Sequence, residues 1–183
     1  MKEIRIHGRG GQGSVLAARM LASAFLAEGK CVASFPMYGF ERRGAPVMAF
    51  TRIDDKPIRE KNQVYNPDCM VVIDPTLLRV PTLFAGIKEE GILILNSPGE
   101  LQNQPDKNVP IAGIVNATQI ALEEMGRDIP NTCLLGAFAA ITNWVKLESI
   151  TRSMSDYFDG SKLDNNIRSA ERGYREVKVE KWR

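Results

Sequence analysis

The sequence predicts an α/β fold: a Rossmann-like, mostly parallel sheet flanked by helices, with a β-hairpin insertion and a helical C-terminal third. Short apolar runs typical of buried strands alternate with helical segments along much of the chain. The first strand runs through the turn Gly8-x-Gly10-x-x-Gly13 directly into an apolar-faced helix. With 183 residues and no linker-like stretch, the chain is expected to form a single domain over 1–183.

The first half of the chain is expected to be rich in strands. Leu16, Leu21 and Phe25 recur on one face of the first helix, and Gly29 follows where a C-cap glycine belongs. Residues 36–46 show neither helical nor strand periodicity and are expected to form a shaped loop. The expected elements are a strand at 3–8, a helix at 12–28, strands at 31–35 and 47–53, and a segment at 57–59 that pairs back as a hairpin.

The second half is expected to begin with buried strands and to end in helices. Its last helix is strongly charged, with Ile167, Ala170, Tyr174 and Val177 as a narrow apolar stripe. Pro81 is expected to lie in a first turn or to mark a break. The expected elements are a strand from Cys69 to the Asp74-Pro75 turn, a helix at 77–87, strands at 92–95 and 111–115 around a polar loop at 98–110, and helices at 117–125, 132–145, 147–157 and 162–178.

The glycine turn is a candidate anion site. A strand brings the chain to the rim of the sheet, and the next helix directs free N–H groups and its positive dipole end into the turn. The alternative is a tight turn whose glycines serve only helix–sheet packing. Ser14 and Gln12 could cap the helix or bond a ligand, and capping is the more frequent role of such a serine. The candidate binding residues in this loop are Gly8, Arg9, Gly10, Gly11, Gln12 and Gly13.

The loop after the second strand should lie beside the glycine turn, because ligands in open α/β sheets bind beyond the carboxyl ends of the strands. Its candidate binding residues are Tyr38, Glu41, Arg42 and Arg43, and the alternative for each charge is a solvated surface position. The strand itself ends Ala33-Ser34-Phe35-Pro36 without the Asp or Glu that holds a dinucleotide's ribose. This argues against NAD and FAD but leaves another phosphate-bearing ligand open.

Several single residues have ordinary structural interpretations. His7 is expected to bond a backbone group rather than to take part in catalysis. Asp74 is expected to cap a helix, and Asn131-Thr132 is interpreted the same way, although Asn131 could also lie near the crevice. No catalytic Ser–His–Asp, Cys–His or paired-carboxylate group can be assembled, so catalytic residues stay unassigned.

Composition excludes several classes of function. A formal charge of +2 gives no basis for nucleic-acid binding, and no run is long enough to span a membrane. The N-terminus has no signal-peptide pattern, so a cytoplasmic location is expected. The three cysteines, Cys31, Cys69 and Cys133, are widely spaced and are expected to be buried free thiols; with one histidine in the chain, no metal site is expected.

Three stretches together resemble the γ subunit of the 2-oxoacid:ferredoxin oxidoreductases, of the pyruvate synthase type. They are Ile-Arg-Ile-His-Gly-Arg-Gly-Gly-Gln-Gly at 4–13, Tyr-Gly-Phe-Glu-Arg-Arg-Gly-Ala-Pro at 38–46, and Ile-Pro-Asn-Thr with Leu-Gly-Ala at 129–137. The resemblance extends over nearly the whole chain. The chain reads Arg43-Gly44-Ala45 where relatives often read Arg-Gly-Gly, which points to a pyruvate or branched-chain subtype rather than a 2-oxoglutarate one.

The resemblance implies a function within a complex. Such complexes use thiamine diphosphate, Mg²⁺ and [4Fe–4S] clusters on other subunits to convert a 2-oxoacid and coenzyme A (CoA) into acyl-CoA and CO₂ while reducing ferredoxin. The γ subunit packs with α, β and δ-type subunits, is associated with CoA and is not expected to be active alone. By resemblance, the positions nearest CoA or a subunit interface are Gly10, Gly11, Gln12, Gly13, Tyr38, Glu41 and Arg42.

Two other functions remain open at this point. The glycine turn also fits a free-standing Rossmann-type nucleotide-binding oxidoreductase, although the acid after the second strand is missing. A scaffold subunit that binds no ligand would use the same turn for assembly alone.

Overall fold

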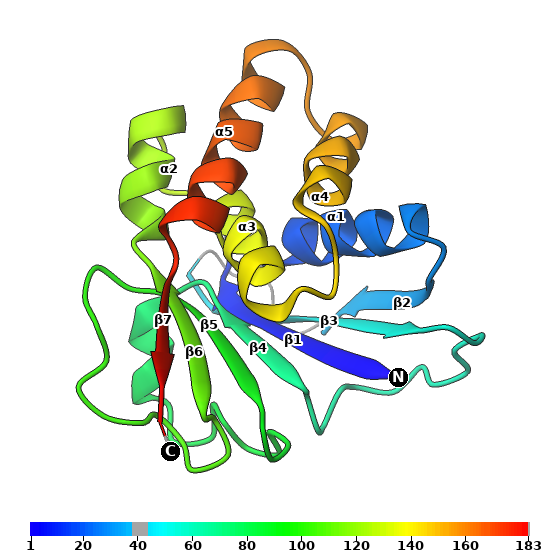
Figure 1. Ribbon diagram of the computed structural model, residues 1–183, viewed down its shortest axis with the longest axis vertical. Helices are drawn as coiled ribbons and strands as arrows, with labels where there is room; N and C mark the ends of the chain where they lie inside the picture. The colour runs from blue at the N-terminus through cyan, green and yellow to red at the C-terminus, as the bar shows by residue number, and fades with distance from the viewer. Residues whose placement is uncertain (38–43, 183) are drawn as a thin grey trace.

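The computed structural model describes residues 1–37 and 44–182 and contains, within them, one seven-stranded sheet in the order β2-β3-β1-β4-β5-β6-β7 (Figure 1). The four central strands β1, β4, β5 and β6 are parallel, which confirms the predicted mostly parallel α/β sheet. The strands are β1 (Lys2–Arg9), β2 (Cys31–Pro36), β3 (Pro46–Asp54), β4 (Cys69–Val72), β5 (Ile92–Asn96), β6 (Ile111–Val115) and β7 (Lys178–Lys181).

The α-helices lie together on one face of this sheet (Figure 1). The opposite face, beneath β4 to β6, is covered by a short 3₁₀ helix and irregular chain. The helices are α1 (Ser14–Ala27), α2 (Ala117–Met125), α3 (Asn131–Thr142), α4 (Leu147–Ser153) and α5 (Gly160–Glu176), and the 3₁₀ helices are η1 (Pro75–Arg79) and η2 (Met154–Asp156).

Side chains alternate across the sheet and so divide the apolar core in two. On β1, Ile4 and Ile6 face the helices and belong to the larger cluster. On β4, Met70 and Val72 face the other way and pack in the smaller cluster under η1. Arg5 and His7, between the two isoleucines and after them, are therefore polar residues on the face without α-helices.

Helices α3 and α5 pack backbone against backbone. At Gly136 a side-chain Cβ would overlap the carbonyl oxygen of Ala170, and at Gly173 it would overlap the carbonyl oxygen of Cys133. Glycine is required at both positions because no larger residue fits between the two backbones. This contact fixes the first turn of α3, which borders the candidate site.

The predicted helix at 77–87 is wrong. Residues 75–79 form the 3₁₀ helix η1, and turns follow it. The cause lies in the Val80-Pro81 pair: a residue before proline is driven out of the helical region, and Val80 is extended, with φ −83° and ψ 114°. Asp74 caps η1 by accepting a hydrogen bond from the Thr76 N–H, as predicted.

The predicted hairpin between 47–53 and 57–59 is also wrong. Strand β3 pairs antiparallel with β1 on one side and with β2 on the other, so both of its edges are occupied. Residues 57–59 are not in a strand, and the chain that follows wraps over Arg52. The Arg52 guanidinium donates to the backbone carbonyls of Asn62 and Gln63, at 2.7 and 3.0 Å, and thereby holds this segment as a loop.

The C-terminal third is helical as predicted, but its boundaries differ. Helix α3 ends at Thr142 because Asn143 adopts a left-handed conformation, so the predicted extension to 145 is wrong. The helix predicted at 147–157 divides into α4 and η2. The last helix ends at Glu176, and Lys178–Lys181 form β7, an edge strand that was not predicted from the sequence.

Candidate functional site

The glycine turn lies at the edge of the sheet where the parallel strands end. Strand β1 ends at Arg9, and α1 begins at Ser14. Gly13 occupies the N-cap position with a left-handed φ of 80°, and a side chain there would collide with the Asn131 amide. The Asn131 Nδ2 donates a hydrogen bond of 3.3 Å to the Gly13 carbonyl, so the start of α3 fixes the start of α1. Asn131 therefore lies at the crevice but does not cap α3, whose N-cap is Pro130.

The polar side chains of the glycine turn are bonded to Asp74. Gln12 donates to the Asp74 carboxylate at 2.8 Å, and Arg9 lies 3.3 Å from it. Arg9 also donates to the hydroxyl of Thr76 at 2.8 Å. Burial would raise the pKa of Asp74, but hydrogen bonds from Thr76 and Gln12 and the nearby Arg9 charge lower it overall. Arg9 and Gln12 thus stabilise the turn itself and are not free to meet an anion.

The backbone of the same turn presents unused donors. Among the described residues, no acceptor bonds the N–H groups of 13–16, the first turn of α1. Ser14 is 3% exposed, and within the same described part of the chain its hydroxyl has no hydrogen-bond partner. The expectation that Ser14 caps the helix is therefore wrong, because Ser14 is already the first helical residue. The hydroxyl lies against Gly8 of β1, where it leaves no room for a side chain, and it does not face the cavity described next.

A cavity of about 400 Å³ opens beside this backbone, and we call it the glycine-loop cavity. Gly13 before α1, Asn131 at the start of α3 and Lys162 in the first turn of α5 all line it, so three helix N-termini converge there. Positive dipole ends favour an anion. Lys162 and Arg127 add two cations at the rim, while Leu16, Ile129 and Phe158 supply apolar wall.

The second predicted loop meets the glycine turn at its described end. The Gly10 N–H donates to the Ala45 carbonyl at 2.9 Å, and the Gly44 N–H donates to the Gly10 carbonyl at 3.2 Å. These bonds continue the β1–β3 ladder and bring Gly44 and Ala45, at the described end of that loop, beside the glycine turn. The predicted binding residues Tyr38, Glu41, Arg42 and Arg43 lie outside the described residues.

The His7 ring bonds no backbone group of residues 1–37 and 44–182, contrary to the expectation from the sequence. Its Nε2 accepts a hydrogen bond of 2.9 Å from Arg5 Nε, on the sheet face away from α1. The three cysteines are free thiols as predicted; Cys69 and Cys133 are buried, whereas Cys31 is partly exposed.

Two cavity residues were missed from the sequence. Arg127 follows α2 and Lys162 lies in α5, more than 100 residues after the glycine turn, and neither belongs to a motif. The closest available signal was Pro130-Asn131 before an apolar helix. The packing of α5 against α3 brings Lys162 to the turn, and Arg127 reaches it from the segment just before α3.

Within residues 1–37 and 44–182, no three or more His, Cys, Asp or Glu side chains are grouped so as to hold a metal ion. In the same ranges, no helix has the length and apolar character needed to cross a membrane.

Comparison with known proteins gives consistent matches. A family model described as pyruvate ferredoxin/flavodoxin oxidoreductase matches residues 3–176. The common subunit gamma of the pyruvate/ketoisovalerate oxidoreductases of Pyrococcus furiosus is 50% identical over 182 residues, 98% of each chain. Pyruvate synthase subunit PorC of Methanothermobacter thermautotrophicus is 48% identical over 177 residues, 97% of this chain and 96% of its own. The crystal structure of the pyruvate oxidoreductase subunit PORC of Thermotoga maritima is similar with a TM-score of 0.85 and 43% identity, covering 98% of both chains.

Proposed function

The chain belongs to the pyruvate ferredoxin/flavodoxin oxidoreductase family, and from this premise we propose that it acts, as one domain over 1–183, as the γ subunit of a pyruvate:ferredoxin oxidoreductase. The complex would convert a 2-oxoacid and CoA into acyl-CoA and CO₂ and pass two electrons to ferredoxin. The observation that carries this proposal is a family match over nearly the full length of the chain, together with about half of the residues shared with named γ subunits.

We assign the remaining cofactors to partner subunits. Thiamine diphosphate, Mg²⁺ and [4Fe–4S] clusters would lie on α, β and δ-type subunits, and the complex would act in the cytoplasm. The relative from Pyrococcus furiosus is named as common to pyruvate and ketoisovalerate oxidoreductases, so a γ subunit can serve two 2-oxoacids. Accordingly, the choice of 2-oxoacid would be made outside this chain.

Within the complex, we propose that the glycine-loop cavity receives a phosphate group of CoA. Free N–H groups at 13–16 and two rim cations favour a phosphate there. The apolar wall would contact the less polar part of CoA. The predicted residues Gly11 and Gly13 contribute through their backbone, whereas the side chains of Arg9 and Gln12 would only maintain the shape of the turn.

This assignment predicts a specific defect in CoA use. In the reconstituted complex, Lys162→Ala or Arg127→Ala should raise the KM for CoA about tenfold each, because a charge-assisted contact to phosphate is removed. The KM for the 2-oxoacid should not change. Steady-state assays of ferredoxin reduction with CoA and pyruvate varied separately measure both constants.

Lys146→Ala is the matched control, since Lys146 is equally exposed but lies before α4, away from this cavity. An unchanged CoA KM in both cavity variants would remove the CoA assignment without touching the subunit assignment. The subunit assignment has its own test: the tagged chain should co-purify with two larger partners and be inactive without them. Activity of the pure chain alone would contradict it.

A ligand-free scaffold role has one observation in its favour. Arg9 and Gln12, the two polar side chains of the glycine turn, are bonded to Asp74 and already satisfied. If the turn serves assembly alone, Gly13→Ala should reduce complex formation while the CoA KM of the residual complex stays normal. Pull-down yield and CoA kinetics on the same preparation separate the two roles.

A further inference from the structure

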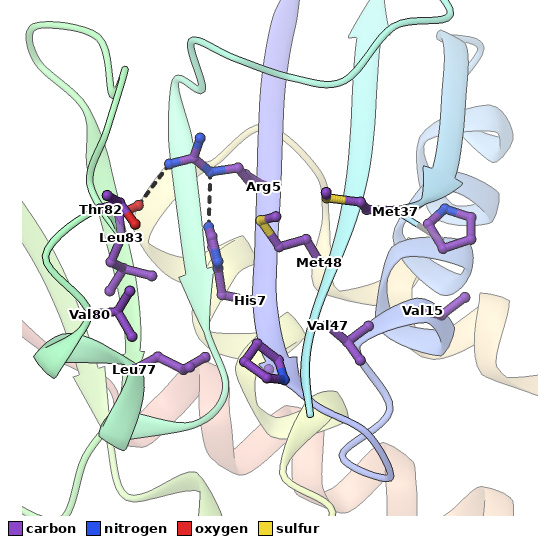
Figure 2. A pocket seen from close by; sticks show the side chains of 13 residues that line it. Arg5, His7, Val15, Met37, Val47, Met48, Leu77, Val80, Thr82 and Leu83 are labelled. Atoms are coloured by element: carbon purple, nitrogen blue, oxygen red, sulfur yellow. Dashed lines mark hydrogen bonds between the residues drawn. The ribbon is translucent and has the colours of Figure 1, made fainter. Parts of the chain in front are cut away.

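A second cavity lies on the sheet face that the α-helices leave open, and nothing in the proposed function uses it. Figure 2 shows Arg5 and His7 next to each other on β1, joined by a hydrogen bond, with Leu77, Val80 and Leu83 on one side and Met48 on the other. We call it the Arg5–His7 cavity; its volume is about 350 Å³. This is within the size range of pockets that hold small organic molecules.

His7 presents a donor that no described residue uses. Its Nε2 accepts from Arg5 Nε at 2.9 Å, and a guanidinium N–H can only donate. Burial, and after it the Arg5 charge, lower the pKa of His7 to about 3, so the ring is neutral at ordinary pH. A neutral ring that accepts at Nε2 carries its proton at Nδ1. No described residue accepts a hydrogen bond from this Nδ1–H, although His7 is only 7% exposed.

Arg5 is a buried cation without a counter-ion in the described part of the chain. The side chain is 7% exposed, and its Nη2 donates to the carbonyls of Leu83 and Ala85 at 2.8 and 3.1 Å. No ion pair joins Arg5 to a carboxylate among residues 1–37 and 44–182. Buried charges in proteins are normally paired, so the positive potential at this cavity, which no described carboxylate balances, favours an anion there.

From these observations we propose that the Arg5–His7 cavity binds a small organic carboxylate with an apolar body. The carboxylate accepts from the Nδ1–H of His7 and lies in the field of Arg5, and the apolar body contacts Leu77, Val80 and Met48. A phosphate fits this site poorly, because the walls are apolar and the donors few. The site is separate from the glycine-loop cavity, which opens among the N-termini of α1, α3 and α5.

The test uses the full chain, alone and in its complex, with isovalerate and benzoate as probes in isothermal titration calorimetry. Saturable binding is expected, and isovaleramide and benzamide, which have the same shape without the charge, should bind about tenfold more weakly. Arg5→Gln should weaken isovalerate binding by a similar factor. Arg19→Gln, at an exposed position on α1 outside the cavity, is the matched control and should bind normally.

A second variant covers the case in which Arg5→Gln folds poorly. Val80 is 40% exposed at the cavity wall, so Val80→Trp should fill the cavity without disturbing the fold and should also abolish binding. Equal affinity for acid and amide, or normal binding by both variants, would overturn the proposal. So would a lack of acid binding combined with impaired subunit assembly in Arg5→Gln, which would assign the cavity to an acidic side chain of a partner subunit.

Discussion

Two arginines on neighbouring strands, Arg5 on β1 and Arg52 on β3, show how differently one sheet face treats a buried cation. Arg52 is 2% exposed, pairs with the Glu3 carboxylate at 2.9 Å and donates to loop carbonyls around it. Arg5 is 7% exposed and is bonded only to carbonyls, a thioether and neutral His7 within the described residues. Arg52 has its counter-ion within the fold, whereas Arg5 borders a cavity and is paired with no carboxylate of the described residues.

The difference teaches that burial alone does not distinguish a structural charge from a functional one, whereas the presence of a counter-ion within the fold does. Arg52 holds the 60–63 loop in place through contacts that are all internal. Burial, and after it the Arg5 charge, lowers the pKa of His7, and Arg5 leaves a positive potential where a ligand can reach it.

The largest effect is expected for Arg52→Met. The change should lower the free energy of unfolding by about 3 kcal/mol or more, because it breaks a buried ion pair and leaves loop carbonyls without a donor. Urea unfolding followed by circular dichroism at pH 7 measures it. The 60–63 loop, which Arg52 holds through its carbonyls, should at the same time become more susceptible to proteolysis.

Arg5→Met is the same chemical change at the contrasting position. It should lower the free energy of unfolding by less, about 1 to 2 kcal/mol, because the removal of a buried charge without a described counter-ion offsets part of the lost hydrogen bonding. Equal losses of unfolding free energy for the two variants would show that Arg5, like Arg52, finds all its partners within the fold, and would remove the contrast.

The effect expected at His7 is of similar size, and it depends on pH. Its pKa lies near 3 in the fold but near 6.5 in the unfolded chain, so the unfolded chain binds more protons between these values. The stability associated with neutral His7 is complete above 6.5 and is lost as the pH falls towards 3. Between pH 7 and pH 5 this loss is about 2 kcal/mol.

His7→Gln should abolish that part of the acid sensitivity, since the Gln side-chain oxygen can still accept from Arg5 Nε and does not titrate. The measurement is the difference in unfolding free energy between pH 7 and pH 5, wild type against variant. Since His7 is the only histidine, the comparison isolates one imidazole. An identical pH dependence of wild type and variant would mean that His7 titrates normally, and it would weaken the contrast between the Arg5 and Arg52 positions.

The smallest effect is expected at the exposed edge of the Arg52 network. Lys88 lies 2.8 Å from Asp68 and 3.3 Å from Glu3, but its side chain is 38% exposed. Lys88→Met should cost less than about 1 kcal/mol, because water and salt screen such a pair. Repeating the urea titration in 1 M NaCl should erase the difference in unfolding free energy between wild type and variant. A larger loss that salt does not reduce would show that Lys88 belongs to the buried network.

Much of the fold could be predicted from the sequence because the central strands carry their own signal. The alternation of Ile4 and Ile6 and the apolar run from Cys69 each specify a buried strand locally. The glycine turn was recognisable for the same reason, since strand, glycines and helix are contiguous. The missed strand β7 has alternating charges and one half-exposed valine, which is too weak a pattern to read alone.

The remaining features depend on contacts between distant segments. No residue near Pro57 indicates that β3 pairs with β1 and β2 and not with 57–59, or that Arg52 holds the following loop. Likewise, Lys162 reaches the glycine turn only through the packing of α5 on α3. A role of the glycine turn in CoA binding was predicted only from the family resemblance. In the structure the side chains of Arg9 and Gln12 are bonded to Asp74, and the unused donors are backbone N–H groups.

The close crossing of α3 and α5 also decides the thiol chemistry of the chain. With Gly173 against its carbonyl, Cys133 is sealed, and burial raises the pKa of its thiol to about 12; burial raises that of Cys69 as well. Neither thiol forms the thiolate that an alkylating reagent attacks. Iodoacetamide should therefore label Cys31 alone in the native chain and all three cysteines after unfolding. The label count per chain then reports whether the two helices remain in contact.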